Sequence, residues 1–182
     1  VDSMVWAKGQ FSASFNKSPN FAPGGYLTDY YTDEAIQVIE KNKHRPFFLY
    51  LAHWAVHNPM QALKDDVEAI RHHTIGHNLQ VYSGMITALD RSVGRIVDAL
   101  EQNGLTDNTF IIITSDNGGA SYIELADIND PYRGWKLTHF EGGTHIPFMA
   151  KWPDQIQAGT KFIPSVHHND IFQTIAAAGN AK

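Results

Sequence analysis

The stretch TFIIITSDNGG, residues 109–119, decides the fold class of this chain. Residues 109–114 form a short, continuous apolar run, which is typical of a strand buried on both faces. Residues 115–119 then supply a polar, glycine-containing loop directly after that strand. Because α/β proteins place their chemistry in such strand-end loops, the sequence predicts an α/β fold with candidate functional residues at Asp116 and Asn117.

Upstream segments extend the α/β pattern. Residues 29–43 have acidic side chains early and lysine late, which predicts an amphipathic helix. Residues 47–52 (FFLYLA) predict a second buried strand. Residues 79–103 carry apolar side chains at helical spacing and end before Gly104, where a C-terminal cap belongs, so they predict the longest helix.

Downstream segments complete the pattern. Residues 120–145 are rich in loop residues, residues 146–150 (IPFMA) predict a third strand, and residues 170–178 predict a final helix. This order of elements predicts a three-layer α/β sandwich with a largely parallel central sheet. We expect residues 1–182 to belong to a single domain.

Composition excludes several classes of function. Of 182 residues, 43% are hydrophobic and 12% aromatic, as in a globular protein, and the net charge of -5 without a basic run disfavours a nucleic-acid partner. No apolar run approaches the roughly 18 to 20 residues that span a bilayer. The chain has no cysteine, which excludes disulfides, thiolate zinc sites and cysteine nucleophiles within it.

Four residues are candidates for chemistry. Asp116 and Asn117 offer hard oxygen ligands that suit Ca²⁺ or Mg²⁺, although Asp, Asn and Gly also form ordinary tight turns. His57, in WAVHNP, follows a predicted strand, where it either donates a proton and holds an anion or is simply a satisfied histidine. Lys136, in RGWKLTHFEGG, is either a fixed charge for a sulfate or phosphate oxygen or a solvated lysine.

Zinc is the less favoured metal. His53 lies four residues before His57, a spacing that would pair two histidines on one helix. The strand before them, Pro59 after them and the lack of a Glu between them argue against such a helix. His72, His73 and His77 are further candidate zinc ligands.

Four segments in order resemble the sulfatase family of the alkaline phosphatase superfamily. They are TDEAIQVIEKNKHRPFFLYLAHWAVHNP, MITALDRSVGRIVDALEQNGLTDNT, FIIITSDNGG and RGWKLTHFEGGTHIPFMAKWP, and together they run from about Leu27 to the end of the chain. The resemblance implies that Asp116 and Asn117 bind a divalent cation, usually calcium, together with two acidic residues from an N-terminal region. It also implies that His57 contacts the sulfate and assists the leaving oxygen, and that Lys136 binds a sulfate oxygen.

The sequence departs from the family pattern in several respects. The paired N-terminal acids that complete the calcium shell in the family, and the family's other lysine-histidine pair, are not found. The family nucleophile is a formylglycine made from a Cys/Ser-x-Pro-x-Arg motif, which this chain lacks, since Ser18-Pro19 has neither the spacing nor the arginine. His145 stands where many members have arginine. We therefore expect a middle-to-late portion of a sulfatase catalytic domain that is inactive and binds calcium weakly by itself, from an exported or lysosomal parent enzyme.

The implied substrate is a sulfated small molecule or a sulfated glycan, with steroid, aryl and glycosaminoglycan sulfates all open. Two alternatives are a phosphatase or phosphonate hydrolase of the same superfamily, and a non-catalytic module that binds an anionic sugar or a partner protein. An incomplete sheet would also expose an edge and an apolar face, which predicts self-association.

Overall fold

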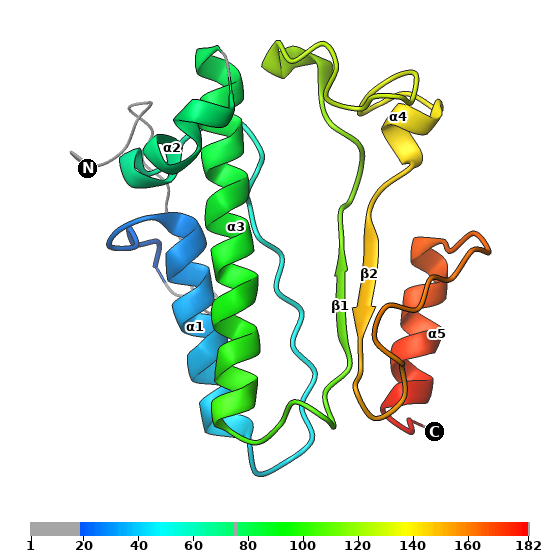
Figure 1. Cartoon of the computed structure of the whole chain (residues 1–182). Helices are drawn as coiled ribbons and strands as arrows, with labels where there is room; N and C mark the ends of the chain where they lie inside the picture. The colour runs from blue at the N-terminus through cyan, green and yellow to red at the C-terminus, as the bar shows by residue number, and fades with distance from the viewer. Residues whose placement is uncertain (1–18, 75, 182) are drawn as a thin grey trace.

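The computed structural model describes residues 19–74 and 76–181. Helices α1 and α3 lie on one side of the β1-β2 pair and α5 lies on the other, which is an incomplete three-layer arrangement (Figure 1). The elements in chain order are α1 (Leu27–Asn42), α2 (Lys64–Ile70), the 3₁₀ helix η1 (Arg71–His73), α3 (His77–Gln102), β1 (Ile111–Thr114), the 3₁₀ helix η2 (Ser121–Ile123), α4 (Glu141–Thr144), β2 (Phe148–Lys151) and α5 (His168–Ala178).

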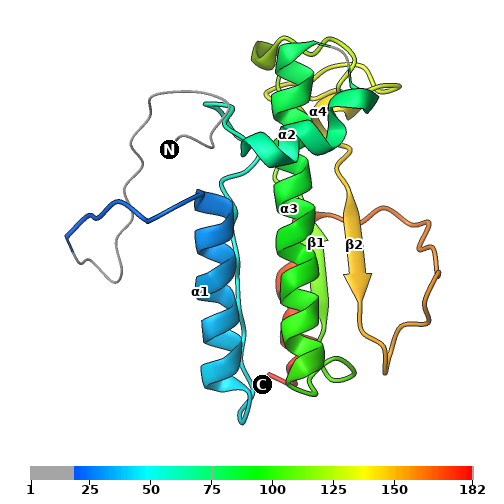
Figure 2. The ribbon, with the colours of Figure 1, turned by 60° about the vertical axis from the view of Figure 1, so that its left-hand side comes forward.

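The two long helices pack along each other, as Figure 2 shows. Helix α1 buries Thr28, Thr32, Ala35 and Ile39, which follow one another at helical spacing on one face. Helix α3 ends where Gly104 adopts a φ of 66°, a conformation that costs glycine little. The predicted helices over residues 29–43 and 79–103 are therefore confirmed.

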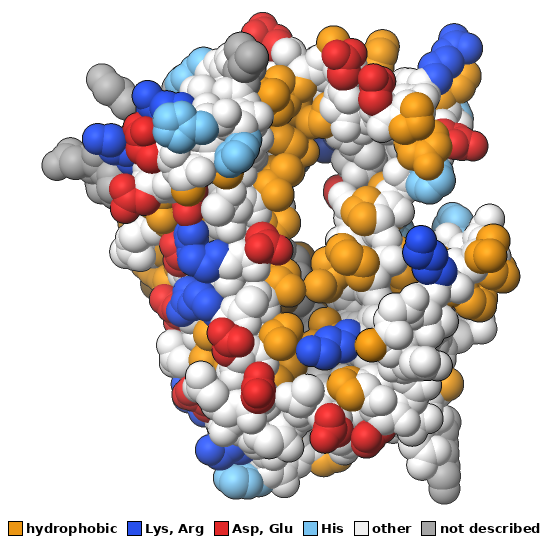
Figure 3. Space-filling model, viewed as in Figure 1, with side chains coloured by type: hydrophobic (Ala, Val, Ile, Leu, Met, Phe, Trp, Pro, Cys, Tyr) orange, Lys and Arg blue, Asp and Glu red, His pale blue; other side chains and the backbone are white. Residues whose placement is uncertain are grey.

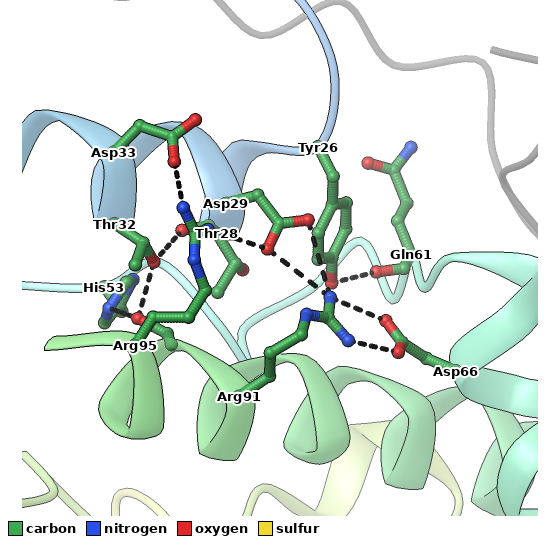
Figure 4. A network of polar contacts seen from close by, with 11 residues as sticks. Tyr26, Thr28, Asp29, Thr32, Asp33, His53, Gln61, Asp66, Arg91 and Arg95 are labelled. Carbon is green, nitrogen blue, oxygen red and sulfur yellow. Dashed lines mark hydrogen bonds and ion pairs between the residues drawn. The ribbon is translucent and has the colours of Figure 1, made fainter. Parts of the chain in front are cut away.

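A polar network joins α1, α2 and α3 (Figure 4). Arg91 of α3 bonds to the buried carboxylate of Asp66 and reaches both oxygens of Asp29 at 3.4 Å. Arg95 bonds to Asp33. Because the buried carboxylate of Asp66 is paired with the partly exposed Arg91, this network links the three helices to one another.

The small apolar core lies between α2 and α3. Ala62, Val67, Val81 and Met85 are all buried and touch one another. Gly84 permits this packing, since a Cβ there would lie 2.9 Å from Val67 Cγ2. Helix α2 was not expected from the sequence.

The strands β1 and β2 pair in an antiparallel ladder. Ile111 lies opposite Lys151, and Thr114 lies opposite Phe148. This pair is the only sheet in the described residues. Its strands run antiparallel, so the expected parallel arrangement is wrong for these two strands. An antiparallel pair is common at the margin of a mixed sheet.

Residues 47–54 are extended but form no strand, which corrects the predicted strand over residues 47–52. Side chains alternate along the segment, with Phe48, Tyr50 and Trp54 exposed by 69%, 80% and 52%. Within the described part of the chain, residues 47–53 make no backbone hydrogen bond. The segment has the pleat of a strand, but it lacks a neighbouring strand at hydrogen-bonding distance.

The space-filling view shows an opening between the helical half and the half that carries β1 and β2, with hydrophobic side chains along both sides (Figure 3). Exposed apolar side chains occur in β2 as well, where Phe148 and Met149 are exposed by 40% and 54%. Among the helices of the described residues, none is both long and apolar enough to cross a membrane.

Candidate active site

Two loops and a short helix meet at the end of β1: the loops are residues 116–119 (DNGG) and 133–136 (RGWK), and residues 141–143 (EGG) belong to α4. The first two are joined where Lys136 N donates to Gly119 O at 2.9 Å. The backbone of Lys136 is thus fixed to the loop that contains the predicted metal ligands. The site is built mainly from backbone-to-backbone contacts.

Glycine is required where these loops cross. Gly118 N donates to Gly143 O at 3.0 Å, and a Cβ at Gly118 would lie 1.9 Å from Gly142 O. A Cβ at Gly142 would lie 2.2 Å from Gly134 O. The glycines therefore allow a close approach of three backbones that any side chain would prevent.

Asn129 hydrogen-bonds to both the 116–119 loop and the 133–136 loop. The sequence did not predict this role. Its Oδ1 accepts from Gly119 N at 2.7 Å, and its Nδ2 donates to Gly119 O and Gly134 O, each at 3.0 Å. No local pattern marked Asn129, because it lies in a loop-rich stretch and its partners are ten and five residues away.

His57 and Lys136 meet although they are 79 residues apart in sequence. The distance from Lys136 Nζ to His57 Nε2 is 3.3 Å. His57 Nδ1 lies 2.9 Å from Asn58 O, and since a carbonyl only accepts, Nδ1 carries the hydrogen. In neutral His57, Nε2 is therefore the acceptor that faces the lysine ammonium.

The ammonium of Lys136 is not neutralised. Among the described residues, no carboxylate lies within salt-bridge distance of its Nζ. An ammonium and an imidazole that converge without a counter-ion form a site for an anion with oxygen atoms. This arrangement is what a sulfate or phosphate group requires.

Asp116 and Asn117 follow β1 directly. Asn117 Nδ2 donates to Gly118 O at 2.9 Å, which leaves its Oδ1 available, and the Asp116 carboxylate is exposed. These two oxygen donors fit a hard divalent cation, but they supply only two of about six to eight ligands that Ca²⁺ takes. The described residues contain no group of three or more His, Cys, Asp or Glu side chains that would complete the shell.

The sequence model of the family described as Sulfatase matches residues 3–181. The chain belongs to the sulfatase family. It is 34% identical to human steryl-sulfatase over 161 residues, which is 85% of this chain and 26% of that protein. It is 36% identical to human N-acetylgalactosamine-6-sulfatase over 157 residues, which is 84% of this chain and 29% of that protein.

Solved structures confirm the fold class. The crystal structure of Ps i-CgsB in complex with k-i-k-neocarrahexaose matches with a TM-score of 0.85 and 36% identity, covering 91% of this chain and 37% of that chain. A Bacteroides thetaiotaomicron sulfatase from a study of glycosaminoglycan metabolism matches with a TM-score of 0.71 and 30% identity, covering 85% and 33%. This sulfatase chain thus spans about a quarter of the curated relatives and has an incomplete alkaline phosphatase-like fold.

Two histidines support the site of this sulfatase chain from its edges. His145, at the position where arginine is common in the family, stacks on Tyr132 with ring centroids 4.2 Å apart and lies 3.5 Å from the Glu141 carboxylate. His168, at the start of α5, bonds through Nε2 to Ser115 O at 3.0 Å. His145 thus contacts Tyr132, which comes just before the loop of Lys136, and His168 contacts Ser115, which comes just before Asp116.

His53, one of the zinc candidates, contacts side chains of α1 and α3. His53 Nε2 lies 2.9 Å from Ser92 Oγ, which in turn lies 2.6 Å from Thr32 Oγ1. Burial lowers the pKa of His53 below its usual 6.5, because the charged imidazolium is desolvated there. His53 is therefore a neutral histidine of the α1–α3 interface.

Proposed function

We propose that the natural-length protein containing this chain hydrolyses sulfate monoesters, and that residues 1–182 form part of its catalytic domain. The observation that carries the proposal is the 3.3 Å approach of Lys136 Nζ to His57 Nε2 at the loop that holds Asp116. Sulfatase family membership favours this activity over that of a phosphatase, a phosphonate hydrolase or a non-catalytic binding module.

His57 and Lys136 have separate tasks in this mechanism. A sulfate group placed at the pair accepts a hydrogen bond from Lys136 Nζ, which offsets the negative charge that repels a nucleophile. A proton taken up at His57 Nε2, which faces Lys136 as an acceptor in the structure, passes to the bridging oxygen as the sulfur–oxygen bond breaks. The product then leaves as an alcohol or phenol, and Nε2 is an acceptor again. Asn58 O keeps the Nδ1 proton in place and orients the ring during this transfer.

The nucleophile comes from a region outside this chain. No Cys/Ser-x-Pro-x-Arg motif occurs in the sequence, so the chain by itself supplies the proton donor and the charge but not the attacking group. Family resemblance assigns that task to a formylglycine. We accordingly expect residues 1–182 alone to release no sulfate.

Calcium is the metal that we assign to Asp116 and Asn117. Sulfatases are metal-dependent enzymes, and a carboxylate beside an amide oxygen favours Ca²⁺ over softer metals. When bound, the cation neutralises sulfate oxygens next to Lys136. Further oxygen ligands would have to join these two side chains, since Ca²⁺ takes about six to eight, and the family resemblance implies two acidic residues from an N-terminal region.

A sulfated glycan is the substrate class that the comparisons support best. Human N-acetylgalactosamine-6-sulfatase carries an amino sugar in its name, and Ps i-CgsB has been crystallised with a neocarrahexaose. Human steryl-sulfatase shows that the family also contains enzymes named for a steroid ester. The choice between these classes depends on the surface beside His57.

Release of inorganic sulfate from sulfated oligosaccharides by the purified natural-length protein tests this function. We expect His57→Ala and Lys136→Ala each to lower kcat/KM by roughly a hundredfold or more, because each removes a charge-assisted contact made in the transition state. His44→Ala and Lys161→Ala, at exposed positions, are the matched controls.

Phosphate release provides the decisive comparison. If the protein hydrolyses 4-nitrophenyl phosphate or a phosphonate ester faster than every sulfate ester tested, the sulfatase proposal is wrong. If it binds sulfated oligosaccharides without releasing sulfate, it is a binding module instead.

A further inference from the structure

A cavity of about 570 Å³ is lined in part by Asn58, whose carbonyl oxygen lies 2.9 Å from His57 Nδ1. Its wall includes Asn58, the residue directly after His57, and it continues over the first turns of α3 and over η2. The volume lies within the range of roughly 300 to 1,000 Å³ that small-ligand sites occupy. No step of the proposed sulfate chemistry uses this space.

The chemistry of the wall is mixed. Met60 and Val81 give an apolar base, and the ring of Tyr122, which is 48% exposed, stands at the side. Asn78 and Glu124 add an amide and a carboxylate. An aromatic ring beside hydrogen-bonding side chains suits a sugar, which has apolar C–H faces and hydroxyl groups at its rim.

Glu124 is held in an unusual conformation. Its backbone has φ 60° and ψ 32°, a left-handed conformation that residues with a side chain rarely adopt. Asn78 Nδ2 donates to Glu124 Oε2 at 3.1 Å, so α3 and η2 are joined across the cavity. Glu124 Oε1 has no partner among the described residues and is an acceptor for a hydroxyl group.

The charges of the side chains that line the cavity favour an uncharged sugar over an acidic one. The residues that line this cavity, all within the described part of the chain, include no lysine and no arginine. A uronic acid or a second sulfated unit would meet Glu124 without a fixed positive charge to offset it. A steroid would leave Asn78 and Glu124 facing an apolar surface without partners.

We infer that the cavity formed by residues 58–60, the start of α3 and residues 122–124 binds an uncharged sugar ring that carries or adjoins the sulfate ester. Tyr122 stacks on the ring, and Glu124 accepts from a hydroxyl group. The inference deepens the proposed function and rests on it. It makes this protein selective for sulfated glycans with a neutral backbone.

Two substitutions in the natural-length protein test the cavity. Glu124→Gly removes the carboxylate at a φ that glycine tolerates, and Tyr122→Ala removes the ring. The substrates are a sulfated galactan hexasaccharide, a chondroitin 6-sulfate hexasaccharide and 4-nitrophenyl sulfate. We expect each variant to lower kcat/KM on the galactan at least about tenfold more than on the aryl ester, as the loss of a charge-assisted hydrogen bond or a stacked ring implies. Glu40→Ala, at an exposed position of α1, is the control.

The outcomes separate the two proposals. Sulfate release from the galactan with the expected tenfold difference supports the sugar site. Equal effects on both substrates, no effect on either, or a preference of the unmodified protein for the chondroitin substrate overturns the sugar site while the sulfatase function stands. Absence of sulfate release from all three substrates overturns both.

Discussion

Asn129 brackets the backbone of Gly119, accepting from its N at 2.7 Å and donating to its O at 3.0 Å. The same amide group also donates to Gly134 O at 3.0 Å. One side chain therefore sets the spacing between the loop of Asp116 and the loop of Lys136. Proper spacing matters because a displacement of about 1 Å can cost a hundredfold in rate.

Asn129→Ala should lower kcat for sulfate release in the natural-length protein by about tenfold or more, because Lys136 loses its fixed position. Asn129→Asp keeps an acceptor for Gly119 N but loses both donated bonds, so its kcat should be intermediate if the amide acts by spacing the loops. Steady-state kinetics with a thermal unfolding control measures both. The exposed Asn108→Ala should match the unmodified protein, and equal kcat for all variants contradicts the role given to Asn129.

Gly118→Ala should abolish activity, since its Cβ would lie 1.9 Å from Gly142 O and the loops must separate to accept it. Gly24→Ala is the matched control, because a Cβ there meets no atom within 4 Å. Sulfate release and thermal midpoints of both variants are the measurements. Normal activity of Gly118→Ala would show that the loops do not approach as described.

Asp116→Asn should raise the free Ca²⁺ concentration needed for half-maximal activity by about tenfold or more, because affinity falls with the number of charged ligands. Activity after chelation should return with Ca²⁺ more readily than with Mg²⁺, which demands a tighter octahedral shell. Asp107→Asn, at an exposed position, is the control. An unchanged Ca²⁺ requirement in Asp116→Asn would remove Asp116 from the metal site.

Acid should destabilise the α1–α3 interface through His53. Burial lowers its pKa below 6.5, so the unfolded state binds a proton that the folded state excludes. The stability is present above about pH 6.5 and is lost as the pH falls toward the lower folded pKa, by up to about 1.4 kcal/mol per pH unit in that window.

His53→Gln removes this titration, and its amide can still bond to Ser92 Oγ. The fall in thermal midpoint between pH 7.5 and 5.5 should therefore be smaller in His53→Gln than in the unmodified protein. His44→Gln, at an exposed position, should leave the fall unchanged. The same pH dependence in all three proteins would rule out His53 as its source.

Residues 1–182 produced alone should self-associate, because Phe48 and Tyr50 project from an extended segment that has no strand partner among the described residues. Replacing both with Lys should shift the protein toward monomer in sedimentation velocity. Val38→Lys on α1, at a position with an isolated exposed side chain, is the control. A monodisperse monomer before any substitution would contradict the prediction.

Local patterns were sufficient to predict α1, α3, α5 and the strand-end loop, but not α2. The apolar spacing of α3 and the run of isoleucines in β1 depend on neighbours within a few residues, and so does the Asp116–Asn117 loop. Family resemblance, rather than periodicity, assigned both His57 and Lys136 to contacts with the sulfate group. The structure places these two side chains in contact, but their chemical roles remain proposals.

Features that depend on distant partners were not predicted. The apolar composition of residues 47–52 favours a strand, but a strand also needs a hydrogen-bonding neighbour, which the described chain does not supply. The antiparallel direction of β2 is set by the path of residues 115–147, which contain no regular pattern. Asn129 and Glu124 act through backbone contacts and a left-handed conformation that side-chain type alone does not indicate.

The opening between the two halves of the molecule has a consequence for heat inactivation. His57 belongs to the half with the long helices, whereas Lys136 belongs to the half with β1. The two side chains can therefore be in contact only while the two halves lie against each other. A small outward swing would separate the pair while every helix stayed intact. We therefore expect sulfate release to disappear at a lower temperature than the helical signal in circular dichroism, with full recovery on cooling.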